Sequence, residues 1–246
     1  MHSPMTIRAV RLAGILIKEQ LKEPIALFWI LLSPSAIFYL LAFSKGSTYF
    51  QQDYSSAAAW FYAYLSLSIA FFGFSFYIIG RRESGFMRSF IYTLHAKTVF
   101  LLAQFLAYSV IALIYCMIFY IMTRPAFGSY SADEALTIFL RFYSCLVLFC
   151  IPGLLLTFLP LNFQTANTIF SIASFLMLAL GISQTALPGT VGTSISALNI
   201  LELGKNIMLD EAPSSRLLII SIFIIFGLAM TQARKHLRIN PIWSRY

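Results

Sequence analysis

The residues that could support acid–base, nucleophilic or metal chemistry are few and widely separated. The three histidines have no carboxylate or cysteine at metal-ligand spacing: His2, His95 and His236. The three cysteines lie in apolar stretches and form no disulfide or zinc pattern: Cys116, Cys145 and Cys150. There is no phosphate-binding loop, zinc-protease motif or nucleophile elbow. We therefore expect no catalytic residue, no cofactor site, no metal site and no enzyme activity on this chain.

The charged residues within the apolar segments are two arginines, Arg141 and Arg216, each near the end of its segment. We expect both to extend their charged groups to the membrane surface. Membrane enzymes and proton-coupled pumps usually need ionisable groups at membrane depth. If this chain moves a substrate uphill, another polypeptide must therefore supply the energy.

Six apolar segments make up most of the chain, which is 59% hydrophobic and only 11% charged. Each is close to the roughly 20 residues that cross a bilayer as a helix. The segments are Ile25–Phe43, Ala57–Ile79, Thr98–Met122, Leu136–Leu159, Thr165–Ser183 and Ser214–Ala233. We expect one all-α membrane domain over residues 25–233, flanked by an interface segment, 1–24, and a tail, 234–246.

Positive charge falls mainly on one side of these spans. The N-terminal segment, the second-to-third connection and the tail hold 12 basic and three acidic residues, whereas the opposite side holds five and six. The positive-inside rule places both termini in the cytoplasm of an inner or plasma membrane. Membrane topology and anionic lipid explain the net charge of +8 without a nucleic-acid partner. The connection Pro160–Gln164 should also be cytoplasmic, yet it carries no charge.

Three segments outside the spans have patterns of their own. Ile7–Glu23 alternates apolar and basic residues at helical spacing, which predicts an amphipathic interface helix. The alternative is a short basic tail that only sets orientation. Gln184–Pro213 is apolar and rich in small residues, and is either a re-entrant outer segment or an ordinary surface loop.

The connection Gly80–Lys97, GRRESGFMRSFIYTLHAK, is the most distinctive of the three. A short cytoplasmic helix there would place Phe86, Phe90 and Ile91 on one side and Arg88 on another. The alternative is a positively charged connector, and charge alone does not separate the two.

Three stretches of the sequence resemble the membrane subunits (permeases) of type-2 export ABC transporters, the ABC-2 permeases. Lys22–Leu41 resembles the family's entry into its first helix, and Arg81–Leu106 resembles its R-E-x-G run into the third span. Leu198–Met208 resembles the segment before the last span, although the family's proline after the asparagine is replaced by Ile200.

The resemblance implies two copies of a six-helix domain, or this chain with a homologous permease, bound to two cytosolic ATPase subunits that hold ATP and Mg²⁺. Ile7–Glu23 would be the connecting helix, Arg81–Ile91 the coupling helix in a groove of the ATPase, and Gln184–Pro213 the outer re-entrant helices. The residues expected to contact the ATPase are Arg81, Arg82, Glu83, Gly85, Phe86, Met87 and Arg88.

The leading functional hypothesis is an exporter subunit that moves an amphipathic drug, peptide or lipid-like substrate outward by alternating access. One alternative is an accessory or immunity-type membrane protein with no transport of its own. The other is a polytopic lipid-modifying enzyme, which the lack of intramembrane histidines and acidic residues disfavours.

Overall fold

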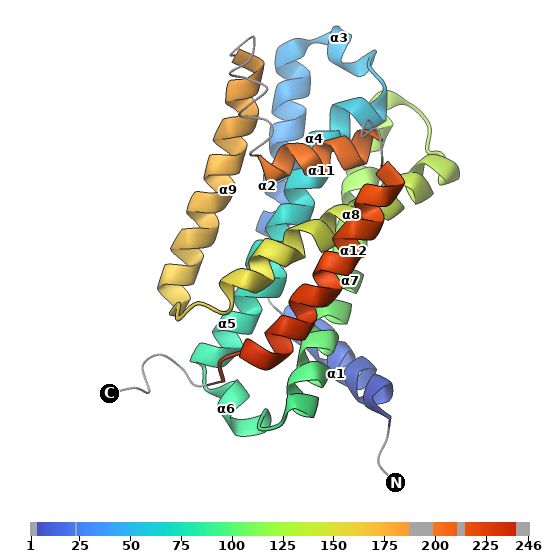
Figure 1. Cartoon of the computed structure of the whole chain (residues 1–246). Helices are drawn as coiled ribbons and strands as arrows, with labels where there is room; N and C mark the ends of the chain where they lie inside the picture. Colours follow the sequence, from blue (N-terminus) through green and yellow to red (C-terminus); the bar gives the residue numbers. More distant parts are fainter. Residues whose placement is uncertain (1–3, 23, 187–198, 211–214, 240–246) are drawn as a thin grey trace.

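The computed structural model of this chain describes residues 4–22, 24–186, 199–210 and 215–239, and these contain helices and no strand (Figure 1). The helices are α1 Met5–Gln20, α2 Pro24–Lys45, α3 Ser47–Phe50, α4 Tyr54–Ser68, the π-helix η1 Ile69–Ser75, α5 Phe76–Glu83, α6 Phe86–Phe90, α7 Leu94–Thr123, the 3-10 helix η2 Arg124–Phe127, α8 Ala132–Leu156, α9 Phe163–Ala186, α11 Ile200–Leu209 and α12 Ser215–His236. The expectation of an all-helical chain is confirmed for this part.

Five helical stretches among the described residues are long and apolar enough to cross a membrane. They are Tyr54–Glu83, Leu94–Phe127, Ala132–Leu156, Phe163–Gly181 and Arg216–His236, and they match the second to sixth expected spans. The first expected span falls on α2, whose stretch Ile30–Ser44 is a shorter apolar helix. The chain is therefore a multi-span membrane protein, and the count of six remains a prediction.

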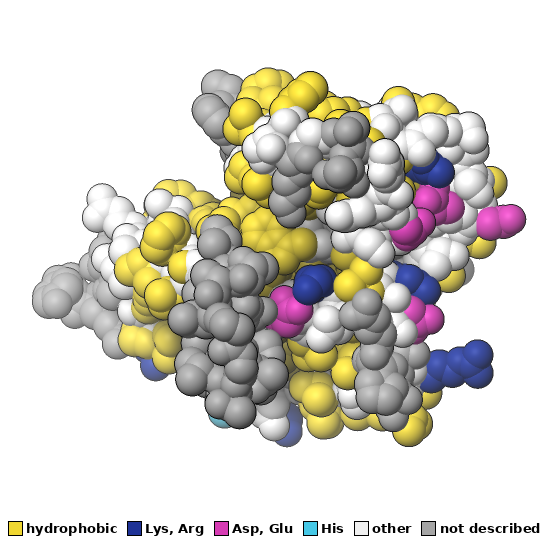
Figure 2. Space-filling view, turned by 90° about the horizontal axis from the view of Figure 1, so that it is seen from above, with side chains coloured by type: hydrophobic (Ala, Val, Ile, Leu, Met, Phe, Trp, Pro, Cys, Tyr) yellow, Lys and Arg dark blue, Asp and Glu magenta, His cyan; other side chains and the backbone are white. Residues whose placement is uncertain are grey.

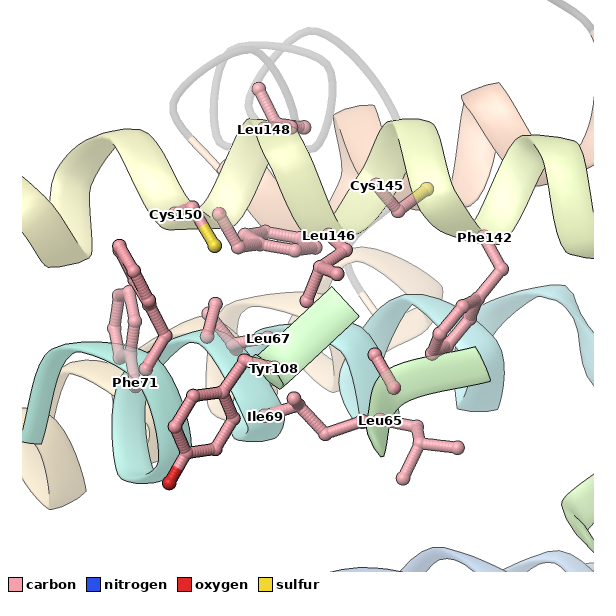
Figure 3. Close-up of a cluster of buried hydrophobic side chains, with 14 of the residues drawn as sticks. Leu65, Leu67, Ile69, Phe71, Tyr108, Phe142, Cys145, Leu146, Leu148 and Cys150 are labelled. Carbon is pink, nitrogen blue, oxygen red and sulfur yellow. The ribbon is translucent and has the colours of Figure 1, made fainter. Parts of the chain in front are cut away.

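The core lies between the α4–η1 helix and α8. Leu67 and Phe71 of the α4–η1 helix lie on the side that faces Leu146 and Cys150 of α8, and all four are almost fully buried (Figure 3). The close approach of α8 to η1 requires a glycine at position 153. A Cβ there would lie only 2.2 Å from the side-chain oxygen of Ser75 in η1. The absence of a side chain at Gly153 therefore lets α8 pack closely against η1.

The N-terminal amphipathic helix is present as α1, and α2 begins directly at Pro24, where a proline's missing N–H costs no hydrogen bond. The buried face of α1, which contacts the rest of the protein, consists of Ala9, Ala13, Leu16 and Gln20. Ala9 and Ala13 are buried, and Ala13 packs in one cluster with Ala103 and Ala107 of α7. Several larger apolar residues, including Val10, are exposed instead. Part of the expected apolar face is thus exposed, whereas Leu16 of that face is buried.

At the opposite end of the bundle, α11 lies across α4 and α8 (Figure 1). Asn199 begins this helix: its Oδ1 accepts a hydrogen bond from the Leu201 N–H at 3.0 Å, and its Nδ2 donates to the Met177 carbonyl of α9 at 3.0 Å. Ile200 therefore occupies the first helical position, where a proline is favoured but not required. Residues 187–198 and 211–214 of the expected re-entrant segment, and 240–246 of the tail, lie outside the described residues.

Candidate partner interface and membrane cavity

The connection between the second and third spans is a broken helix. We expected one helix over Arg81–Ile91, but α5 ends at Glu83 and α6 begins at Phe86. Between them Gly85 has φ 78°, in the left-handed region that side chains with a Cβ rarely adopt. Gly85 was expected to allow close approach of the ATPase. The structure shows that the turn between α5 and α6 itself requires a glycine at this position.

Arg82 is buried inside the chain, with 1% of its surface exposed. Its guanidinium donates to the carbonyls of Thr157 at 3.0 Å, Leu159 at 3.2 Å and Leu161, and its Nε bonds Glu83 at 3.0 Å. These carbonyls end α8 and lead to α9, and a cation is favoured at a helix C-terminus. The connection Pro160–Gln164 has no charged residue of its own, and Arg82 of α5 places a positive charge beside it.

Arg81 also has partners within the chain. Its guanidinium pairs with Glu19 at the end of α1, and it lies over the ring of Phe86, 5.0 Å from the ring centre. The pair joins the interface helix to the α5–α6 turn. Arg81, Arg82 and Glu83 are therefore less available to another protein than the sequence suggested.

A different set of side chains is exposed beyond the turn, and we call it the tip: Arg88, Phe90, Tyr92 and Leu94. The three apolar members are 68%, 74% and 59% exposed. Met87, expected as a partner anchor, is fully buried. Tyr92 and Leu94 were not expected to be part of the interface, because the predicted coupling helix ended at Ile91. They lie in the short linker after α6 and in the first turn of α7.

A further contact ties the start of α7 to the last span. The Lys97 ammonium donates to the Leu237 carbonyl, just beyond α12, at 2.8 Å. Together with Arg81 and Arg82, it links the α5–α7 connection to the ends of α1, α8 and α12.

A cavity of about 530 Å³ opens beside this turn, between α2, η1, α5 and α9. Its wall is mainly aromatic and its rim carries the Arg81–Glu19 pair. The lining residues are Glu19, Ile30, Phe72, Phe76, Tyr77, Gly80, Arg81, Ser84, Phe86 and Phe163. Such a wall fits an apolar or amphipathic molecule better than an ion.

The opposite end of the molecule carries paired charges. Arg124 bonds Glu134 at 2.6 Å, and Arg141 donates to the Met208 carbonyl at the end of α11 at 2.8 Å. Figure 2 shows acidic and basic side chains close together on this end. Arg141, which was expected to extend to the membrane surface, also pairs with the exposed Asp210 at 3.2 Å at this end of the molecule.

No group of three or more metal-binding side chains occurs in the part of the chain that the structure describes. The three cysteines are buried and free, and the Cys145 thiol lies 3.2 Å from the Gly204 carbonyl. They pack in the core of a multi-span, all-helical membrane protein.

Comparison with known proteins gives one informative relative. Protein McbE of Escherichia coli is 23% identical over 237 residues, a match that covers 96% of this chain and 98% of that protein. The two chains are thus distantly related over almost their whole length. No family model and no solved structure matches.

Proposed function

We propose that this chain is the membrane-spanning subunit of an ATP-driven exporter, in which a separate ATPase subunit hydrolyses ATP. The tip supports this proposal most directly. It exposes Phe90, Tyr92 and Leu94 beside Arg88, on the side that the charge distribution predicts to be cytoplasmic. Aromatic side chains next to an arginine are the residues that most often anchor protein interfaces.

The contacts around the tip suit the transmission of force. α5 continues the helix that crosses the membrane from Tyr54, and Arg82 joins it to the end of α8. Lys97 joins the start of α7 to the end of α12. A partner that moves the tip would therefore move the second, third, fourth and sixth expected spans together.

The aromatic cavity forms part of the proposed substrate path. α9 contacts α5, η1 and α11, but most of its surface is exposed, including Ile172 and Phe175. A second permease copy packed on α2 and α9 would enclose the cavity. An amphipathic substrate fits its aromatic wall and its charged rim.

The ATPase partnership is tested with Phe90→Asp. The chain is co-expressed with the P-loop ATPase encoded nearest to its gene, and co-purification and ATPase activity are measured. A carboxylate placed in a desolvated contact costs a few kcal/mol. We therefore expect normal membrane abundance, at least tenfold weaker ATPase association and no export.

The control is Ser56→Asp, which changes an exposed serine at the opposite end of the molecule. It should leave association unchanged. ATP hydrolysis by the purified chain alone would refute the proposal. Unchanged association and export in Phe90→Asp would make the α5–α6 connection a plain connector, and failure of the wild type to bind an ATPase would favour the accessory membrane protein.

A further inference from the structure

A second cavity lies between α1 and the two helices α7 and α8, at the surface of the molecule. It measures about 650 Å³ and is formed where α1 meets α7 and α8. Its lining is Val10, Ala13, Gly14, Ile17, Leu106, Ser109, Val110, Leu113, Phe139, Leu140 and Tyr143. We call it the α1 groove. The lining residues of α7, from Leu106 to Leu113, extend over about 10 Å of this helix.

The walls of the α1 groove present carbon almost throughout. Its two hydroxyls, on Ser109 and Tyr143, lie 3.3 Å apart and bond one another across α7 and α8. No hydrogen-bonding ligand is therefore required inside the groove, and an apolar chain fits it.

Gly14 opens the groove at its α1 end. A Cβ at this position would meet nothing within 4 Å, so packing does not require glycine here. Glycine in the middle of a helix is also unfavourable relative to alanine. The open space beside Gly14 is thus a feature that the fold of the chain alone does not explain.

Two cations lie beside this opening. Arg11 is three residues before Gly14 and Lys18 is four residues after it, so helical spacing places both on the same side of α1. Both side chains are exposed. They stand where the helix surface passes from the apolar groove to water.

We propose that the α1 groove binds an anionic phospholipid from the leaflet on the α1 side, with one acyl chain along α7 and α8 and the phosphate between Arg11 and Lys18. The groove faces the hydrocarbon region, which favours lipid over a soluble partner. The paired cations favour an anionic headgroup over a zwitterionic one. This inference needs only the membrane-spanning fold and stands whether or not the chain is an exporter subunit.

The test uses the full chain, delipidated in detergent and titrated with phosphatidylglycerol or with phosphatidylcholine of identical acyl chains, and native mass spectrometry measures bound lipid. We expect one phosphatidylglycerol to bind preferentially. Gly14→Leu should fill the groove and abolish this preferred binding. Arg11→Gln and Lys18→Gln should each weaken phosphatidylglycerol about fivefold and leave phosphatidylcholine unchanged.

Matched controls exist for both kinds of change. Gly227→Leu places the same side chain at another exposed helix glycine with nothing within 4 Å of its Cβ, outside the groove. Arg88→Gln removes an exposed cation elsewhere. Neither should alter lipid binding. Val110→Trp, from the α7 wall, provides a second blocking variant if Gly14→Leu yields too little protein.

Several results would overturn the proposal. One is equal binding of the two lipids by the wild type, and another is undiminished phosphatidylglycerol binding when either blocking variant is folded. A shift from dimer to monomer in Gly14→Leu, without loss of lipid, would assign the groove to a second copy of the chain.

Discussion

Arginine and lysine side chains at the α6 end of the molecule donate hydrogen bonds to backbone carbonyls. Arg82 bonds three carbonyls after α8, and Lys97 bonds one beyond α12. A helix leaves its last carbonyls without internal partners, and water is scarce near the membrane. The charges that orient the chain therefore also complete its helix ends.

Replacement of Arg82 by alanine should destabilise the protein strongly. The change removes the buried guanidinium that donates to the Thr157, Leu159 and Leu161 carbonyls and pairs with Glu83. Loss of one member of a buried pair costs about 3 to 5 kcal/mol. We expect a clear fall in the thermal midpoint in detergent, measured by tryptophan fluorescence.

Two further variants make this result specific. Arg82→Lys should recover part of the loss, because an ammonium keeps the charge but lacks the planar fork of a guanidinium. Arg88→Ala removes an exposed arginine of the same connection and should change stability by about 0.5 kcal/mol or less. Equal midpoints for the alanine variants at positions 82 and 88 would contradict the buried role.

At the scale of elements, α11 depends on a close contact with α8 and α4. A Cβ at Gly204 would lie 2.9 Å from the ring of Phe149 and 3.3 Å from the Ala63 Cβ. Phe149 is fully buried and has little room to move. The glycine thus allows α11 to lie flat across two spans.

Gly204→Ala should therefore displace α11, at a cost of about 1 to 3 kcal/mol for overpacking. The measurement is the thermal midpoint, together with protease sensitivity of the outer segment. Gly227→Ala on α12 makes the same change where the Cβ meets nothing, and it should be neutral or slightly stabilising. If the two variants behave alike, the contact between α11 and α8 is looser than described.

The apolar pattern was enough to predict helices because each span must satisfy its own backbone hydrogen bonds. Five expected spans coincide with long helices, and α1 lies where amphipathic spacing placed it. Contacts between distant segments could not be predicted in this way. The burial of Arg82 depends on carbonyls 75 to 79 residues away, and nothing in the local pattern of Arg81–Ile91 indicates them.

The same limit applies to the candidate interface. The resemblance to ABC-2 permeases drew attention to Phe86 and Met87, but tertiary packing covers Met87 and leaves Tyr92 and Leu94 exposed. The break at Gly85 rotates α6 relative to α5, so helical spacing no longer relates the two halves of the connection. The Ser84–Gly85 pair, which follows three charged residues, is the local turn signal that could have predicted this break.

For the whole molecule, the sequence assigns the α6 end to the cytoplasm. The segments that the sequence predicts to be cytoplasmic sum to a net charge of +9 and the others to −1, and three ion pairs join described side chains of the latter. The orientation also decides whether the tip can meet a cytosolic ATPase. It can be measured independently of any transport activity.

Cysteines introduced one at a time at Ser56 and Ser84, which are exposed at opposite ends of the molecule, test the orientation. In intact cells, an impermeant thiol reagent should label a cysteine at position 56 and leave one at position 84 unlabelled until the membrane is permeabilised. Cys116, Cys145 and Cys150 are at most 1% exposed, so the unmodified chain should stay unlabelled and serves as the control. Labelling at position 84 in intact cells would reverse the assigned orientation, and with it the tip would lose access to a cytosolic ATPase.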